Sequence, residues 1–108
     1  MKSLLQGNKK ECYLTGRRDF LERHHIFFGS ANRKKSEQWG CWVWLVPELH
    51  NASSEAVHFN RELDLRLKRE CQEAFEKKYG HKLFMREFGK NYLDPAEPSI
   101  GRRNIGEF

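Results

Sequence analysis

The chain is poor in cysteine and proline and has no long hydrophobic run. Its 108 residues include three cysteines and three prolines, and the cysteines form no CxxC pair. A disulfide framework or a four-cysteine zinc ribbon is therefore not expected. No apolar run approaches membrane-spanning length, and no N-terminal stretch has the pattern of a signal peptide. These absences predict a reduced, soluble, cytoplasmic protein with no membrane contact.

Positive charge and aromatic side chains are abundant. Lys and Arg outnumber Asp and Glu by 20 to 15, which gives a formal charge of +5, and there are eight Phe, three Tyr and three Trp. The length fits one small domain, whose thin core large aromatics can fill. The charge favours an anionic partner, with nucleic acid as the leading candidate.

The first half of the chain predicts two strands joined by a long loop. Residues 1–11 are polar and lysine-rich, which is typical of a loosely held, flexible arm. Alternation predicts a strand from about Asp19 to Phe28. The segment 29–40, GSANRKKSEQWG, begins and ends with glycine and predicts a loop with one helical turn. The apolar run CWVWLV predicts a second strand at 41–46, which ends before a proline that cannot donate to a sheet.

The second half predicts two helices. The segment 61–80 has apolar residues at helical spacing, with Asn60 as a candidate N-cap and glycine at its end. A shorter helix fits 81–89, and an extended tail follows from 94 to 108. The expected fold class is α+β, with residues 12–93 as a single domain in which a two-stranded antiparallel hairpin packs on the long helix.

Four of the five histidines fall at the ends of these expected elements. His24 and His25 end the first strand, His50 follows the second strand, and His58 precedes the long helix. Neutral imidazole is the commonest protein ligand of transition metals, and three such ligands leave open positions for catalysis. Any single histidine could instead be a core or surface residue, so the metal-site hypothesis depends on the whole set.

The stretches RHHIFFG, LVPELHN and VHFN resemble the HNH endonuclease family with its ββα-metal fold. More narrowly, they resemble small HNH-like proteins encoded by phages and prophages. In colicin-type DNases, which belong to this family, a His-His pair closes the first strand and further histidines come from the start of the helix. The resemblance covers roughly residues 12 to 80.

The resemblance implies a role for each histidine. His24 would be a metal ligand, His25 the general base that activates water, and His50 and His58 the residues that complete the metal site. One divalent ion, Mg²⁺, Mn²⁺, Ni²⁺ or Zn²⁺, would contact the scissile phosphate and stabilise the leaving 3′ oxygen. These roles suit phosphodiester hydrolysis, because a histidine can take a proton near neutral pH and a metal can neutralise developing charge. If His24 and His25 serve one phosphate, the strand must bend or end there.

The sequence departs from the family pattern in three places. Cys41 stands where the asparagine that orients the general base usually lies, and Asn32 and Asn51 are the nearby asparagines that could replace it. The separate zinc site with two CxxC pairs, which many members have, is missing. The spacing from His50 to His58 exceeds one helical turn, so His50 could act behind the metal ligands.

Basic residues surround the proposed site in the sequence. They would hold phosphates of double-stranded DNA without reading sequence, which predicts little specificity and a strong dependence on salt. Trp42 and Trp44 could stack on bases, although the core is the more usual place for them. The candidate phosphate-binding residues are Arg17, Arg18, Arg23, Arg33, Lys34 and Lys35.

Three glutamates, Glu22, Glu48 and Glu55, are expected at the surface. Of these, Glu48 is near enough to His50 in the sequence to orient its ring.

Two hypotheses follow from different classes of protein. The first is a metal-dependent HNH-type DNA endonuclease. The second is an HNH-like module that binds nucleic acid or protein without turnover, for example a phage regulator or an inhibitor with a host protein as partner. In the first, mutation of His25 abolishes function; in the second, it leaves the biological effect intact.

Overall fold

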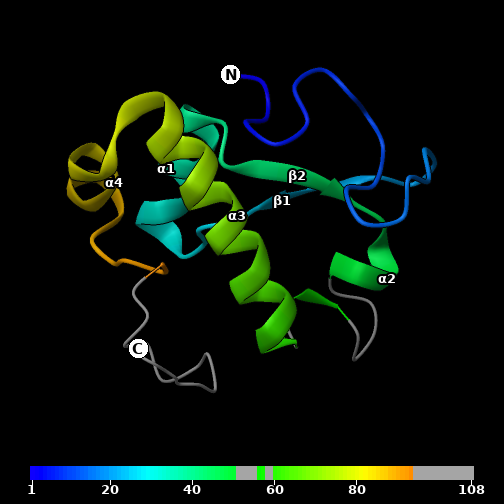
Figure 1. The fold of residues 1–108 in the computed structure, drawn as a ribbon. Coiled ribbons are helices and arrows are strands. Elements are labelled where there is room, and N and C mark those ends of the chain that lie inside the picture. Colours follow the sequence, from blue (N-terminus) through cyan, green and yellow to red (C-terminus); the bar gives the residue numbers. More distant parts are fainter. Residues whose placement is uncertain (51–55, 58–59, 94–108) are drawn as a thin grey trace.

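The computed structural model describes residues 1–50, 56–57 and 60–93, and it has an α+β architecture (Figure 1). Two short strands form an antiparallel hairpin, and the longest helix crosses one face of this hairpin. In chain order the elements are β1 (Glu22–His25), α1 (Ser30–Trp39), β2 (Trp42–Leu45), α2 (Pro47–His50), α3 (Arg61–Tyr79) and α4 (His81–Phe88).

The hairpin register separates two sets of side chains. His24 pairs with Val43, and His25 pairs with Trp42. Because side chains alternate along a strand, the set that contains His24 and Val43 lies on one face, and the set that contains His25 and Trp42 lies on the other. Val43 belongs to the same core as α3, so His24 lies on the helix-facing side of the hairpin.

The first strand is shorter than the expected range of 19–28. Phe20 has a φ of 54°, outside the range of extended backbone, so the strand begins only at Glu22. The backbone N–H of Ile26 still donates to the carbonyl of Cys41 at 2.9 Å, and after Ile26 the chain leaves the ladder. The backbone N–H of Phe27 donates to the hydroxyl of Ser36 instead of to a strand. The strand is therefore centred where the sequence predicted it, but both of its ends were placed too far out.

Residues 30–39 form the ten-residue helix α1, so the prediction of a loop with one helical turn was wrong. Its segment, SANRKKSEQW, has no apolar stripe, and Ser36 is its only buried residue. Side-chain hydrogen bonds and a ring contact hold the helix in place instead. The Ser36 hydroxyl bonds the backbone of Phe27 in both directions, and the Trp39 ring packs edge-on against Phe75. Gly40, with a φ of 75°, ends the helix in the left-handed conformation.

The two predicted C-terminal helices are confirmed. Asn60 caps α3 as expected, because its side-chain oxygen accepts from the backbone N–H of Leu63 at 3.1 Å. α3 buries an apolar stripe against the hairpin and against α4. The centre of the core is an aromatic cluster in which ring centroids lie 4.5 to 6.1 Å apart: Phe27, Phe75, Phe84 and Phe88.

The N-terminal segment packs along β2, which differs from the expected loosely held arm. The hydroxyl of Ser3 donates to the carbonyl of Trp42, and the side-chain oxygen of Gln6 accepts from the backbone N–H of Trp44 at 2.9 Å. The backbone N–H of Tyr13 donates to the carbonyl of Trp44 at 2.8 Å. These bonds satisfy the outer edge of β2, which would otherwise be an open strand edge. Polar composition alone could not show that these polar groups have partners inside the domain.

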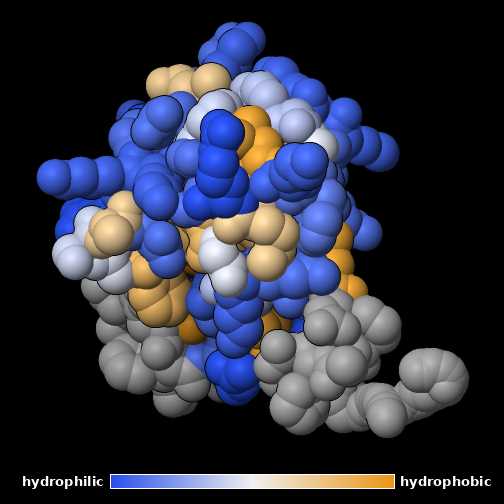
Figure 2. Space-filling model, turned by 90° about the vertical axis from the view of Figure 1, so that its left-hand side faces the viewer, coloured by the Kyte–Doolittle hydropathy of each residue, from blue (hydrophilic) through white to orange (hydrophobic). Residues whose placement is uncertain are grey.

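Polar side chains cover most of the face drawn in Figure 2, and apolar side chains show between them. This distribution is usual for a small domain whose apolar residues cannot all be buried. Among the residues that the structure describes, no helix is both long and apolar enough to cross a membrane.

Candidate active-site cleft

A cleft of about 460 Å³ opens where β1 ends and α1 begins, with α2 contributing its last residue. We call it the histidine cleft. It holds three imidazoles, two guanidinium groups and the first residues of α1. Its lining residues are Arg23, His24, His25, Phe28, Gly29, Ser30, Arg33 and His50.

The end of β1 brings the two adjacent histidines into this one cleft. His24 lies on the helix-facing side of the hairpin and is 1% exposed, whereas His25 lies on the opposite side. Neighbouring residues inside a strand would point away from each other. β1 stops at His25, however, and both residues line the cleft at the end of the strand, although the His24 side chain is almost fully buried. The geometric condition that the sequence set for a shared phosphate is therefore met.

His25 is held by a carboxylate from α1. Its Nε2 lies 2.7 Å from Oε1 of Glu37, and the other oxygen, Oε2, accepts from Arg23 at 2.7 Å. The hydrogen bond from His25 lowers the pKa of Glu37 below its ordinary value, and the bond from Arg23 adds to this effect against a partial opposition from burial. A carboxylate can only accept, so Nε2 carries the proton of this bond. In the neutral ring, Nδ1 is then the acceptor nitrogen.

His50 forms a second pair of the same kind. Its Nδ1 lies 2.8 Å from Oε1 of Glu22, so this ring keeps Nε2 as its acceptor nitrogen when neutral. The rings of His24 and His50 lie with centroids 5.3 Å apart at an angle of 70°. Glu22 therefore orients the ring of His50. Glu22 was expected to be an ordinary surface residue, but it bonds a residue of the cleft.

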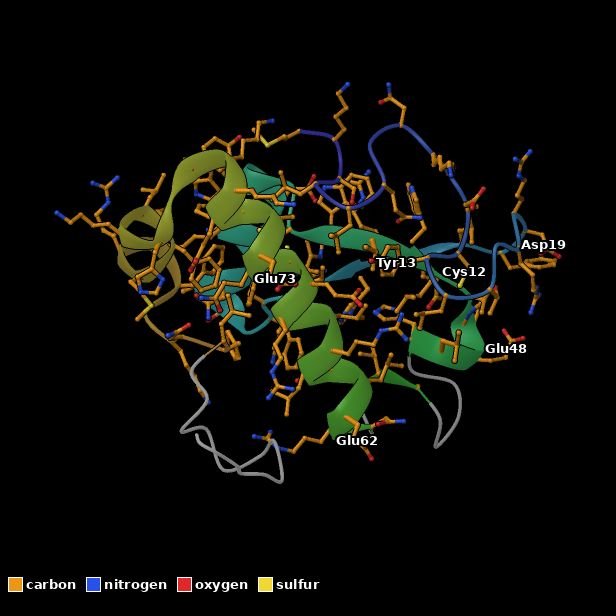
Figure 3. The ribbon with its side chains drawn as sticks, viewed as in Figure 1. Cys12, Tyr13, Asp19, Glu48, Glu62 and Glu73 are labelled. Atoms are coloured by element: carbon orange, nitrogen blue, oxygen red, sulfur yellow. The ribbon has the colours of Figure 1, made fainter. Side chains whose placement is uncertain are left out.

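The expectation that Glu48 orients His50 was wrong. Oε2 of Glu48 accepts from Arg17 at 2.7 Å, and Arg17 also lies 3.4 Å from Asp19. Figure 3 shows Asp19 and Glu48 at the same end of the molecule. The hydrogen bond with Arg17 lowers the pKa of the Glu48 carboxyl. The Glu48 side chain therefore points from α2 toward Arg17, in the loop that precedes β1.

The N-terminus of α1 provides an anion-binding feature of the cleft. The first backbone N–H groups of a helix have no partner within the helix and carry a partial positive charge. No side chain caps α1, and Gly29 and Ser30, at its start, line the cleft. Arg33, one turn along, lines it too and is exposed. This combination suits a phosphate group.

The structure places only two of the six predicted phosphate-binding residues, Arg23 and Arg33, at the cleft. Lys35 points the other way, because its Nζ donates to the carbonyl of Glu87 at 2.7 Å. Four residues are not among those that line the cleft: Arg17, Arg18, Lys34 and Lys35. Arg17 forms ion pairs with Asp19 and Glu48, whereas Arg18 and Lys34 are exposed. A cluster in the sequence therefore does not become a cluster around the cleft.

The expected asparagines do not orient His25 in the described part of the chain. Asn32 lies on α1 but is not among the residues that line the cleft, and Glu37 bonds the ring instead. Asn51 and His58 lie outside the described residues. Cys41 is a fully buried free thiol. Its hydrogen bond with the Cys71 thiol, together with burial, raises the pKa of Cys71 well above its ordinary value. Cys41 is therefore a core residue.

Sequence reasoning missed Glu22 and Glu37 as partners of the histidines. Glu37 lies four residues after Arg33, so the two share a helix face once residues 30–39 are known to be helical. With that segment taken as a loop, nothing in the sequence directs Glu37 toward His25. Glu22 shares a face of β1 with His24, but its contact with His50 spans 28 residues. Only the folded chain brings this pair together.

No family model, curated protein or solved structure matches the chain. The functional argument therefore depends on the chemistry of the histidine cleft.

Proposed function

We propose that the protein is a metal-dependent endonuclease of the HNH type, with a ββα-metal unit, that hydrolyses DNA phosphodiester bonds with little sequence specificity. The observation that supports the proposal most strongly is the pair of histidine–carboxylate hydrogen bonds in one cleft. Nε2 of His25 lies 2.7 Å from Glu37, and Nδ1 of His50 lies 2.8 Å from Glu22. Structural histidines need no such matched arrangement around a basic cleft.

His25 acts as the general base. Glu37 accepts a hydrogen bond from Nε2 and so fixes the orientation of the ring. The other nitrogen, Nδ1, takes a proton from a water molecule as the water oxygen attacks phosphorus. The bond from phosphorus to the 3′ oxygen breaks, and the released 3′ oxygen takes a proton from solvent water, which leaves a 5′ phosphate and a 3′ hydroxyl. Arg23 bonds the second oxygen of Glu37 and so keeps that carboxylate aligned with the ring.

The residues fit one divalent metal ion. The ring centroids of His24 and His50 are 5.3 Å apart, and two imidazoles on one tetrahedral ion, with metal–nitrogen bonds of about 2.0 Å, have centroids on the order of 5 Å apart. A carboxylate on the far nitrogen is the usual partner of a metal-bound histidine, and Glu22 is placed as one. No third His, Cys, Asp or Glu joins them within the part of the chain that the structure describes. We propose His58 as the third ligand.

When bound, the ion would polarise the phosphate and stabilise the leaving oxygen. Imidazole ligands suit Zn²⁺ and Ni²⁺ better than Mg²⁺ and Mn²⁺, which prefer oxygen ligands. Arg33 and the first N–H groups of α1 hold a phosphate through charge and backbone contacts. Such contacts carry no sequence information, which accounts for the low specificity.

Nicking of supercoiled plasmid DNA tests the proposal. The purified protein is incubated with Mg²⁺, Mn²⁺, Ni²⁺ or Zn²⁺ and with a chelator, beside the variants His25→Ala, His50→Ala and His81→Ala. His81 is the matched control, because it is exposed, bonds Glu76 and does not line the cleft. We expect nicking that requires metal and that His25→Ala and His50→Ala lose while His81→Ala keeps it.

Absence of nicking with every metal, or equal nicking by His25→Ala, would contradict the nuclease assignment. If DNA binding persisted in that case, the protein would be the alternative, a binding module that keeps the scaffold without turnover.

A further inference from the structure

The outer face of the hairpin carries alternating cations and indole rings. The guanidinium carbon of Arg23 lies 3.8 Å from the ring centroid of Trp42 and 5.1 Å from that of Trp44. Nζ of Lys10 lies 5.0 Å from the Trp44 ring centroid, and the two indoles meet edge-on at 5.4 Å. We call these four residues the outer track.

The outer track lies on the side of the hairpin opposite Val43 and Leu45, and of its two indoles Trp42 is buried, with its N–H donating to the carbonyl of Met1 at 3.2 Å. Arg23 pairs with Trp44 across the ladder, whereas Val43 and Leu45, which alternate with the tryptophans, are fully buried in the core with α3. Trp44 is half-buried and Lys10 is exposed. The N-terminal segment brings Lys10 to this face, because it runs along the edge of β2.

The outer track is continuous with the histidine cleft. Arg23 lines the cleft and stacks on Trp42, and Arg33 lines the same cleft. A polyanion whose phosphate sits at His25 therefore meets Arg33 and Arg23 in the cleft and Lys10 beyond the indoles. Neither Lys10 nor Arg33 forms an ion pair with another described residue, so both retain charge for a ligand.

We propose that the outer track binds an unpaired DNA strand that continues from the cleft, with a phosphate on Lys10 and a base stacked on Trp44. Cations interleaved with aromatic rings are the usual device for binding single strands, because every base has a face that can stack. In a duplex the faces of the bases are stacked on one another, so a duplex would contact only the cations of the outer track. The position of the strand relative to the cut depends on the proposed nuclease function, whereas binding to the outer track does not.

Equilibrium binding tests the proposal without any cleavage. The probe is a fluorescein-labelled 12-nucleotide oligo-dT, with a 12-base-pair duplex as comparison. All proteins carry His25→Ala and are measured with chelator. The track variants are Trp44→Leu, which keeps an apolar side chain without the ring, and Lys10→Ala. The control is Lys82→Ala, an exposed lysine on α4.

We expect Trp44→Leu to weaken oligo-dT binding about tenfold, as the loss of one stacked base does. Lys10→Ala should reduce the slope of log affinity against log salt by about 0.7, the value for one phosphate of a single strand. Lys82→Ala should leave both quantities unchanged, and duplex binding by Trp44→Leu should change less than twofold.

Equal oligo-dT affinities for the parent protein and Lys10→Ala, with equal salt slopes, would overturn the proposal. Because Lys10 is exposed, this result stands even if Trp44→Leu fails to fold. Equal losses for oligo-dT and duplex in a Trp44→Leu protein that keeps the parent circular-dichroism spectrum would also overturn it, because the ring would then make no contact specific to an unpaired strand. Normal track binding together with no plasmid nicking would refute the nuclease function alone.

Discussion

Removal of the Glu37 side chain should slow DNA cleavage far more than it destabilises the fold. Glu37 accepts from His25 and from Arg23, both at 2.7 Å, so Glu37→Ala releases the ring of the proposed general base. The ring can then rotate, and either nitrogen can carry the proton. Catalysis suffers because the acceptor Nδ1 no longer faces the water.

The magnitude can be estimated from the exposure of the pair. Loss of a carboxylate behind a metal-binding histidine typically costs about 10- to 100-fold. We expect a loss of the same order for the positioned base His25, or about 1.4 to 2.8 kcal/mol in activation free energy. The Glu37 side chain is 43% exposed, so its ion pair with Arg23 contributes at most about 1 kcal/mol to stability. For a domain of this size, that corresponds to a fall in Tm of about 4 to 8 °C at most.

The assay is single-turnover cleavage of a labelled DNA duplex at saturating protein, with Tm measured by circular dichroism. Glu37→Gln, which keeps an oxygen acceptor for His25, should recover part of the rate. Glu73→Ala is the control, because Glu73 is an exposed acid on α3, labelled in Figure 3, and does not line the cleft. A wild-type cleavage rate in Glu37→Ala, at full DNA occupancy, would refute the positioning role.

Three further predictions concern packing, ionisation and DNA affinity. Gly40→Ala should destabilise the protein by about 1–3 kcal/mol more than Gly89→Ala in urea unfolding, because both glycines have a left-handed φ but only at Gly40 would the new Cβ collide with the backbone of the N-terminal segment. Burial, together with the Glu70 carboxylate that accepts a hydrogen bond from its hydroxyl, raises the pKa of Tyr13 to about 12. The free energy of unfolding should therefore fall as pH rises from about 10 to 12, and Tyr13→Phe should remove that part of the fall. An unchanged pH dependence in the variant would contradict this prediction. Arg33→Ala should reduce the salt slope of duplex binding by about 0.9 while Lys35→Ala leaves it unchanged, and equal slopes in filter-binding titrations would place the phosphate elsewhere.

The sequence predicts those elements whose own residues show a local pattern, such as an apolar period or a capping residue. Helix α3 has an apolar stripe and an N-cap at Asn60, and β2 has alternating large residues that stop at Pro47. The adjacent histidines also show in the sequence. Together these features were enough to predict the hairpin, the long helix and the presence of His24, His25 and His50 in one cleft.

The sequence does not predict what depends on contacts between distant residues. α1 has a single buried residue, a serine, so its helical character has no hydrophobic period to reveal it. The N-terminal segment is ordered by hydrogen bonds to β2 rather than by apolar burial. Glu37 and Glu22 reach their histidines only when α1 and α2 have packed beside β1. The carboxylates that define the chemistry of the cleft are therefore properties of the fold.

The central claim is that His25 activates water in a metal-dependent DNA nuclease. The most direct test is the single-turnover rate of duplex cleavage by wild-type protein and by His25→Ala, at a metal concentration that saturates both, with the ends of the products analysed. We predict that His25→Ala is slower by about 10²- to 10⁴-fold, that it binds the duplex with wild-type affinity, and that wild-type products carry 5′ phosphate and 3′ hydroxyl ends. Equal rates for the two proteins, or cleavage by neither with any divalent metal, would contradict the account.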